Sequence, residues 1–126
     1  MVKLQEQKQL ASAELLAKRI DTHRAALERD PRDFVINPTG KITVVEFFDY
    51  RCGYCKLAEP ELAKIIQANP DVRFVFKEFV IFGADSEAAA RAAIGARAQG
   101  KYYDLHRRFM AEKALDRAAL PRLMQA

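Results

Sequence analysis

Residues 42–55 read ITVVEFFDYRCGYC and contain both cysteines of the chain, Cys52 and Cys55. The first seven residues are β-branched or aromatic and are apolar on both faces apart from Glu46. That pattern predicts a strand buried on both sides, as in an α/β sheet. The cysteines follow where this strand gives way to a helical stretch that continues to about Ala68. The sequence therefore predicts a strand, a Cys-X-X-Cys turn and a helix in direct succession.

The chain on either side of this stretch extends the α/β pattern. The breaker NPD at residues 69–71 ends the helix, and residues 72–82 (VRFVFKEFVIF) alternate as a second strand. Strand, helix and strand form a βαβ unit, whose strands we expect to be parallel with a right-handed crossover. Residues 34–36 (FVI) are a further short strand candidate, and the turn sequence NPTG follows at residues 37–40.

The remainder of the chain is predicted to be helical. Asp85 or Ser86 can cap an alanine-rich helix that ends at Gly100, a residue suited to the position after a helix C-terminus. A second helix is expected over residues 101–112. A third, shorter piece follows, and Pro121 lies too deep in it for a regular helix. We therefore expect that last helix to be kinked or to start later.

Residues 1–30 predict one long polar helix, since no Gly or Pro interrupts them. The helix carries a sparse stripe whose spacing alternates between three and four residues, as in a heptad seam: Ala13, Leu16, Ile20, His23 and Leu27. The stripe is equally compatible with an oligomerisation stalk and with an amphipathic helix that lies on its own domain. The sequence is thus divided into residues 1–30 and a domain over residues 31–126.

Composition and charge exclude several classes of protein. The chain has 126 residues, of which 50% are hydrophobic and 30% charged, so we expect one folded domain rather than a disordered chain. The net charge of +4 is spread thinly among acidic residues, whereas nucleic-acid binders concentrate their basic residues on one face. No uncharged run approaches the roughly 20 apolar residues of a membrane span. We therefore expect neither nucleic-acid binding nor a membrane span.

The two cysteines predict redox chemistry. A thiolate at Cys52 would lie at a helix N-terminus, where backbone N–H groups and the helix dipole lower a thiol pKa, so Cys52 is the expected nucleophile. Cys55, one turn into the helix, would resolve the mixed disulfide, and the intervening Gly53 and Tyr54 would tune the redox balance. A zinc site would need further ligands, and a structural disulfide across so small a loop would add little stability. No cofactor and no metal site is expected.

Glu46 is an acid inside an otherwise apolar strand, six positions before Cys52. A buried carboxylate near Cys55 can exchange the proton that moves when Cys55 attacks, and burial would raise its pKa. The alternative is that Glu46 merely reaches solvent at a strand edge. Lys77 and Glu78 on the next strand are weaker contributors to the same region. The two histidines, His23 and His106, are expected to be ordinary surface or core residues.

Several segments resemble the DsbA-like disulfide oxidoreductases of the thioredoxin fold. They are VVEFFDY at residues 44–50, CGYC at residues 52–55, FKEF at residues 76–79 and QGKY at residues 99–102. Within that family the chain is most similar to the bacterial ScsC-like branch, which has a long N-terminal helix. The resemblance covers about residues 33–108.

The resemblance implies a thioredoxin fold with a helical insertion and an exported, periplasmic protein whose signal peptide is not in this chain. It also implies dithiol–disulfide exchange with protein substrates and a redox partner protein. On this basis Cys52 corresponds to the nucleophile, Cys55 to the resolving cysteine and Glu46 to the buried acid of the family. Some ScsC-like members trimerise through their N-terminal helices and act as isomerases, which makes a homo-oligomer possible here.

Two departures from the family affect this interpretation. Val80 stands where the family often has proline, and the chain ends before the strands and cis-proline loop of the family's second half. We therefore expect the C-terminal half of the fold to be absent and residues 72–82 to present an unpaired, apolar edge that recruits another copy. The predicted function is a thiol:disulfide oxidoreductase or isomerase. The alternative is a copper- or zinc-holding thiol pair in an oligomeric periplasmic binding protein without catalytic turnover.

Overall fold

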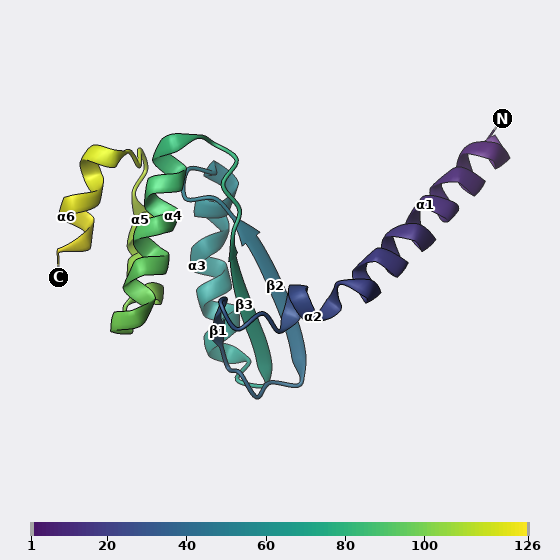
Figure 1. The fold of residues 1–126 in the computed structure, drawn as a ribbon, viewed down its shortest axis with the longest axis horizontal. Coiled ribbons are helices and arrows are strands. Elements are labelled where there is room, and N and C mark those ends of the chain that lie inside the picture. The colour runs from purple at the N-terminus through teal and green to yellow at the C-terminus, as the bar shows by residue number, and fades with distance from the viewer. Residues whose placement is uncertain (1, 126) are drawn as a thin grey trace. The chain divides into compact units, whose positions relative to one another are not determined.

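The computed structural model describes residues 2–125, which divide into two units, Met1–Arg32 and Asp33–Ala126. The first unit contains α1 (Val2–Thr22) and α2 (Arg24–Glu28). The second contains three strands, four α-helices and two short 3₁₀ helices (Figure 1): β1 (Phe34–Ile36), β2 (Ile42–Phe48), α3 (Gly53–Ala68), β3 (Val72–Glu78), α4 (Ala84–Ala96), η1 (Arg97–Gln99), α5 (Tyr102–Ala111), η2 (Arg117–Ala119) and α6 (Leu120–Met124).

The N-terminal unit is helical, but the single helix expected over residues 1–30 is wrong. The helix is interrupted at His23, whose φ of −103° and ψ of 13° leave the helical region. The preceding Thr22 turns its hydroxyl onto the Lys18 carbonyl at 2.9 Å, a contact that disturbs helices. The predicted stripe is therefore divided between α1, the break and α2. Its α1 members Leu16 and Ile20 are 58% and 41% exposed within this unit.

The sheet has the strand order β1-β3-β2, with β3 parallel to β2 and antiparallel to β1. The parallel βαβ unit is thus confirmed. Two expectations about it are wrong: β2 is not buried on both sides, and β3 is not an edge strand but lies between the two edge strands β1 and β2. Among residues 2–125, β2 pairs with β3 alone, and its side chains Val44 and Phe47 are 39% and 50% exposed. The central β3 ends at Glu78, and residues 79–82 leave the sheet.

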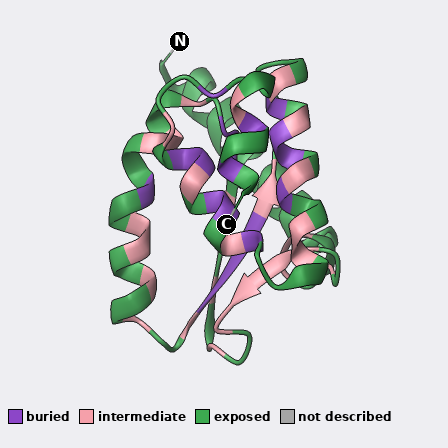
Figure 2. Cartoon of the chain, turned by 90° about the vertical axis from the view of Figure 1, so that its left-hand side faces the viewer, coloured by how far each residue is buried: buried purple, intermediate pink, exposed green. Residues whose placement is uncertain are grey.

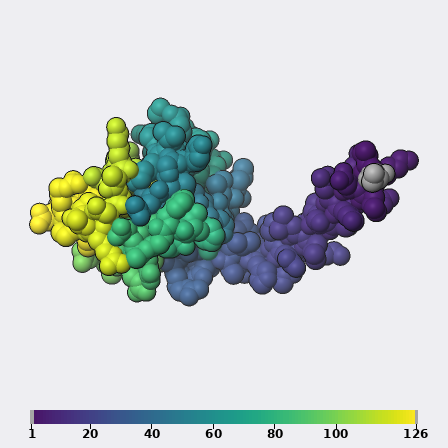
Figure 3. Space-filling model, turned by 90° about the horizontal axis from the view of Figure 1, so that it is seen from above, coloured from purple at the N-terminus to yellow at the C-terminus, as the bar shows by residue number. Residues whose placement is uncertain are grey.

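The core of the second unit lies between the sheet and its helices. Helix α5 packs against both α3 and α4. Figure 2 shows buried residues, in purple, on the helices and on the sheet. The space-filling view shows the segments from α4 to α6, in green to yellow, beside the teal surface of α3 (Figure 3). The core cluster draws on strands and helices alike: Phe48, Phe74, Phe76, Ala89, Ala93, Tyr102, Leu105 and Phe109.

The observed helix ends in this region agree only in part with those predicted from the sequence. Gly100 adopts the left-handed conformation with φ of 70°, as expected after a helix C-terminus. The expected cap at Asp85 or Ser86 is wrong, because Gly83 occupies the N-cap position without a side-chain hydrogen bond. Pro121 lies in the first turn of α6, which begins at Leu120, so the last helix does start late. Within residues 2–125, no helix is both long and apolar enough to cross a bilayer.

Candidate active site

Cys52 occupies the N-cap position of α3, directly after the loop that leaves β2. Its backbone is extended, with φ of −79° and ψ of 116°, and its Sγ accepts a hydrogen bond from the Cys55 backbone N–H at 3.3 Å. This is the geometry of a Ser or Asp helix cap, with sulfur in place of oxygen. The polar N-terminus of α3 therefore stabilises negative charge on Cys52.

The two thiols differ in acidity. The pKa of Cys52 is lowered by a hydrogen bond from the Cys55 thiol and by the backbone N–H groups of Cys55 and Tyr54. The pKa of Cys55 is raised to about 11 by burial, by its hydrogen bond to Cys52 and by the charge of Glu46. Cys52 is thus suited to attack as a thiolate and Cys55 to retain its proton until the second step.

Gly53 and Tyr54, the predicted redox-tuning residues, face outward between the cysteines. A Cβ at Gly53 would meet nothing within 4 Å, so steric crowding does not require glycine there. The side chain of Tyr54 is 85% exposed, and Leu57, one turn further along α3, is 74% exposed. The first turns of α3 therefore expose large, mainly apolar side chains beside the cysteines in the sequence.

Glu46 lies on β2 opposite Phe76 of β3 and is half-buried. Burial, together with the charge of Glu59, raises the pKa of Glu46 to about 7. The charge of Glu46 in turn raises the pKa of the Cys55 thiol, so the two groups interact. The structure thus brings Glu46 into the electrostatic field of Cys55 with an acidity suited to proton exchange near neutral pH.

Lys77 and Glu78 point in different directions, as successive residues of a strand do. Lys77 forms an ion pair with Asp33. Glu78 accepts hydrogen bonds from the hydroxyls of Tyr50 at 2.9 Å and Tyr102 at 2.8 Å. Burial raises the pKa of Glu78 to about 7, against the lowering effect of these two bonds. Of this pair, Glu78 belongs to a partly buried polar network with Tyr50 and Tyr102.

Asp49, which the sequence reasoning did not single out, organises the loop before Cys52. Its Oδ1 accepts hydrogen bonds from the Arg51 N–H and the Ser86 hydroxyl, both at 2.7 Å. Its Oδ2 accepts from the N–H groups of Ile81 at 2.8 Å and Phe82 at 3.1 Å. One carboxylate therefore joins the active-site loop to the segment after β3 and to α4. An acid directly after a buried strand was the available signal.

His106 and Glu59 form a second buried feature that the sequence did not reveal. His106 is fully buried, and its Nε2 lies 3.3 Å from Glu59 Oε2 while its Nδ1 lies 3.0 Å from the Tyr50 hydroxyl. Glu59 is buried on α3, four residues after Cys55. That spacing places Glu59 one helical turn from Cys55, which was the signal for it.

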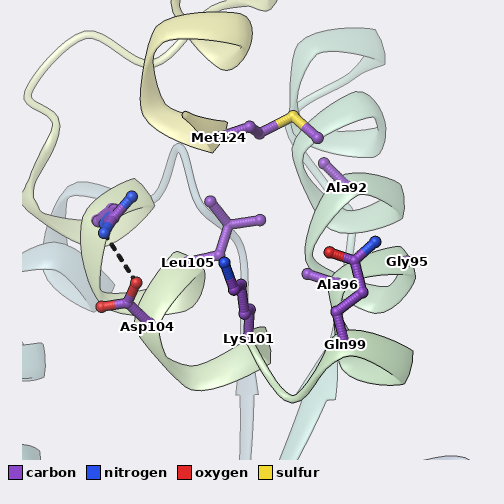
Figure 4. A pocket seen from close by; sticks show the side chains of 9 residues that line it. Ala92, Gly95, Ala96, Gln99, Lys101, Asp104, Leu105 and Met124 are labelled. Carbon is purple, nitrogen blue, oxygen red and sulfur yellow. Dashed lines mark ion pairs between the residues drawn. The ribbon is translucent and has the colours of Figure 1, made fainter. Parts of the chain in front are cut away.

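Other possible sites lie elsewhere or are not formed. Within residues 2–125, no group of three or more His, Cys, Asp or Glu side chains is arranged to hold a metal ion. A cavity of about 210 Å³ lies between α4, α5 and α6 (Figure 4). Its wall includes the Asp104–Arg108 ion pair of 2.9 Å and contains neither cysteine. This cavity is separate from the cysteine site.

Solved structures of several other proteins resemble this one. A thioredoxin-like oxidoreductase from Silicibacter pomeroyi is 43% identical with a TM-score of 0.76, covering 79% of this chain and 59% of its own. The catalytic domain of Proteus mirabilis ScsC is 30% identical with a TM-score of 0.81, covering 86% and 64%. A periplasmic thioredoxin-like protein from Salmonella enterica serovar Typhimurium is 33% identical with a TM-score of 0.76, covering 81% and 61%.

The chain spans 59–64% of the length of these solved relatives. It also spans 12% of curated sodium–proton antiporters from Salinispora, which it matches at 33–35% identity over 81 residues. The family described as the DSBA-like thioredoxin domain matches residues 43–124, which include β2, both cysteines and helices α3 to α6. The chain therefore belongs to the DSBA-like thioredoxin domain family.

Proposed function

We propose that the chain catalyses thiol–disulfide exchange on exported proteins, with Cys52 as nucleophile and Cys55 as resolving cysteine. The observation that carries this proposal is the 3.3 Å hydrogen bond from the Cys55 N–H to Cys52 Sγ at the start of α3. It stabilises a thiolate on the outer sulfur, while the inner thiol has a raised pKa. Such a difference in acidity is what stepwise exchange through a mixed disulfide requires.

The oxidising reaction has two balanced steps. A substrate thiolate attacks Cys52 Sγ of the Cys52–Cys55 disulfide, and Cys55 leaves as a thiolate that takes a proton from Glu46. A second substrate thiolate then attacks the substrate sulfur of the mixed disulfide and releases Cys52 as a thiolate. The substrate gains a disulfide, and its two electrons now reside in the dithiol. A redox partner protein must remove them before the next cycle.

Exposed apolar side chains suit the same site to protein substrates. Tyr54 is 85% exposed, and Phe79 and Phe82 after β3 are 53% and 49% exposed. Asp49 holds this segment against the cysteine loop through its bonds to Ile81 and Phe82. An unfolded substrate offers matching apolar segments around its cysteines, so these residues provide contacts that a small thiol cannot use.

A trapping experiment tests the assignment. The Cys55→Ala variant is expected to accumulate a mixed disulfide with a scrambled, disulfide-containing protein, because nothing resolves the intermediate. The Cys52→Ser variant is the matched control and should form no adduct and show no exchange. Equal adduct formation by both variants, or trapping through Cys55 in Cys52→Ser, would contradict the assigned roles.

Isomerase activity in an oligomer is the finer part of the proposal. The stripe residues Leu16 and Ile20 are exposed apolar side chains on α1. Pairing them between copies would bring several active sites toward one substrate, which raises effective concentration during disulfide shuffling. Deletion of residues 1–32 should reduce the mass seen by light scattering and lower isomerase activity more than reduction of a small disulfide. A full chain that is monomeric at high concentration would exclude this arrangement.

A periplasmic location is the corresponding proposal for the cellular context. It is supported by the Salmonella relative, whose description is that of a periplasmic protein. Oxidising conditions there let a Cys-X-X-Cys pair cycle with exported substrates. Fractionation of cells that produce the natural protein should recover it with periplasmic markers; recovery with cytosolic markers would refute the location.

A further inference from the structure

A continuous row of hydrogen bonds runs through the core beneath the active site. Glu78 Oε1 lies 2.9 Å from the Tyr50 hydroxyl, which lies 3.0 Å from His106 Nδ1. On the other side of the ring, His106 Nε2 lies 3.3 Å from Glu59 Oε2. The exposed fractions of Tyr50, His106 and Glu59 are 1%, 0% and 6%, so this part of the row is buried, while Glu78 at its end is half-buried.

We propose that Glu78, Tyr50, His106 and Glu59 form a buried proton path, and that a proton moves along it between the two carboxyl groups when the cysteine pair is oxidised or reduced. The inference rests on the proposed function, because it assigns these residues a role in that same redox cycle. It makes them positioning residues, which act on Cys55 through Glu46 rather than by touching substrate.

The donors and acceptors of the path allow two arrangements of the same net charge, each with one ionised carboxylate. In one, protonated Glu78 donates to Tyr50, Tyr50 donates to His106 Nδ1, and Nε2–H donates to the Glu59 carboxylate. In the other, protonated Glu59 donates to Nε2, Nδ1–H donates to Tyr50, and Tyr50 donates to the Glu78 carboxylate. The two differ by one proton moved between the carboxyl groups, and each bond keeps one hydrogen. No charged tyrosine or histidine is left behind.

The active site supplies the bias between the two arrangements. In the reduced state, negative charge on Cys52 disfavours a second charge on Glu59, which lies one turn beyond Cys55 on α3. The proton then resides on Glu59. When the disulfide forms, the Cys52 charge disappears and Cys55 passes its proton to Glu46. Glu59 can now ionise by sending its proton to Glu78.

The proton movement changes the pKa of Glu46 at the step in which Glu46 exchanges a proton with Cys55. Burial and the Glu59 charge both hold the pKa of Glu46 near 7. An ionised Glu59 therefore helps Glu46 keep the proton that it received from Cys55. When the disulfide is reduced again, protonation of Glu59 removes that effect, and Glu46 can return its proton to Cys55.

Other charged or titratable groups also face the path. Arg107 forms an ion pair with Glu59, in which Nε lies 3.9 Å from Oε1, too far for a hydrogen bond. The charge of Asp49 raises the pKa of Glu78, and the Tyr102 hydroxyl donates to Glu78 from outside the path. The ring of Tyr103 stacks 6.1 Å from the His106 ring. None of these groups links the two carboxyl groups.

Infrared difference spectra of the full chain, oxidised minus reduced near pH 7, test the path. Carbonyl bands of protonated carboxylic acids report which carboxyl groups gain or lose a proton. In a Glu46→Gln background, which removes the Glu46 signal, we expect a gained band from Glu78 and a lost band from Glu59. Adding Tyr50→Phe removes one hydroxyl from the centre of the path and should abolish both bands.

Tyr102→Phe in the same background is the matched control. It also removes a hydroxyl that bonds Glu78, but one outside the path, so both bands should remain with the Glu78 band shifted. If Tyr50→Phe does not fold, His106→Gln serves as the interrupting variant and should likewise abolish the bands. Two results would overturn the path. The first is that both carbonyl bands remain after Tyr50 or His106 is replaced. The second is that they are already absent when Glu46 alone is replaced. Failure of the cysteines to cycle between dithiol and disulfide would instead overturn the proposed function.

Discussion

The side chains of Asp49 and Ser86 are both buried and are joined by a hydrogen bond of 2.7 Å. This contact fixes the start of α4 to the loop before Cys52. Ser86, one of the two residues expected to cap this helix, donates its hydroxyl to Asp49 instead, and Gly83 stands at the cap position. The helical segment and the cysteine loop are therefore held as one structural unit.

Replacing Asp49 should destabilise the protein strongly. Asp49→Ala removes a buried carboxylate that accepts four hydrogen bonds and leaves the donors unsatisfied. We expect the free energy of unfolding to fall by about 3 kcal/mol at pH 7, since a hydrogen bond to a charged group contributes roughly 1.5–3 kcal/mol. Urea denaturation measures this change. Asp85→Ala is the control: it breaks two surface ion pairs, of 3.8 Å with Arg51 and 3.4 Å with Arg117, and should change the free energy of unfolding by about 1 kcal/mol or less.

The pH dependence of the same variant has a definite sign. Burial alone would raise the pKa of Asp49, but hydrogen bonds from the Ser86 hydroxyl and from three backbone N–H groups lower it overall. A lowered pKa in the folded state gives stability that is present above the unfolded value and lost as the pH falls through the folded value. The difference in the free energy of unfolding between wild type and Asp49→Ala should therefore become smaller in acid. A difference that grows below pH 4 would contradict the lowered pKa of Asp49.

The two thiols should react at different rates. The pKa of Cys52 is lowered and that of Cys55 is raised to about 11, so Cys52 holds the larger thiolate fraction at neutral pH. Iodoacetamide should label Cys52 at least about tenfold faster than Cys55 at pH 7, as followed by mass spectrometry of peptides. Labelling of Cys52 should level off below the ordinary thiol pKa of roughly 8.5. Equal labelling of both residues with ordinary pH profiles would refute the asymmetry.

Glu46→Gln should stabilise the protein at high pH and alter exchange. The pKa of Glu46 is raised to about 7, so the folded state binds its proton more tightly than the unfolded state does. Stability due to this group is therefore present below the unfolded pKa of about 4.3 and lost as the pH rises to 7. We expect the variant to be more stable than wild type by about 2 kcal/mol at pH 8, allowing for partial exposure.

In the same variant, the rate at which Cys55 resolves the mixed disulfide should no longer change with pH around neutrality. Without Glu46, the carboxyl group that acts on Cys55 and titrates near pH 7, the rate of mixed-disulfide resolution should lack an inflection there and should fall by roughly tenfold or more at neutral pH. Stopped-flow measurement of substrate release checks this. Asp71→Asn, at an exposed position before β3, is the control. An unchanged inflection in Glu46→Gln would assign the step to another group.

Sequence predicted the local parts of the site because local patterns determine them. The apolar run before Cys52, the helix after it and the spacing of the two cysteines place a sulfur at a helix N-terminus without knowledge of the rest of the chain. The position of β2 in the sheet could not be predicted in this way. An apolar strand shows that it has neighbours to cover its faces, but it does not show which strands pair with its edges.

The buried histidine was missed for a related reason. His106 meets Tyr50 across 56 positions of the sequence and Glu59 across 47. Neither contact leaves a periodic signal, because only the packing of α5 against α3 and the sheet brings the three side chains together. Long-range polar contacts of this kind need the folded coordinates, whereas the helical face that carries His106 was evident from Leu105 and its neighbours.

The exposed edge of β2 should promote self-association. Within residues 2–125, this strand pairs with β3 alone, and Ile42 and Val44 are 60% and 39% exposed. Unpaired apolar edges bind other strands, and lysine on an edge prevents it. Val44→Lys should therefore lower the mass measured by sedimentation velocity in a chain lacking residues 1–32, where α1 cannot contribute. Ile94→Lys makes the same chemical change at a 53% exposed position on α4 and should leave the mass unchanged.

The solved relatives suggest what the edge binds in a longer protein. This chain spans 59–64% of their length, so they carry segments that have no counterpart here. A version extended by two further strands and a helix should cover β2, remain monomeric at this edge and exchange disulfides with protein substrates faster than the 126-residue chain. Thiol reactivity of Cys52 should be equal in both, because it depends on the start of α3. A 126-residue chain that stays monomeric without residues 1–32 and matches the extended version in turnover would show that the edge needs no partner.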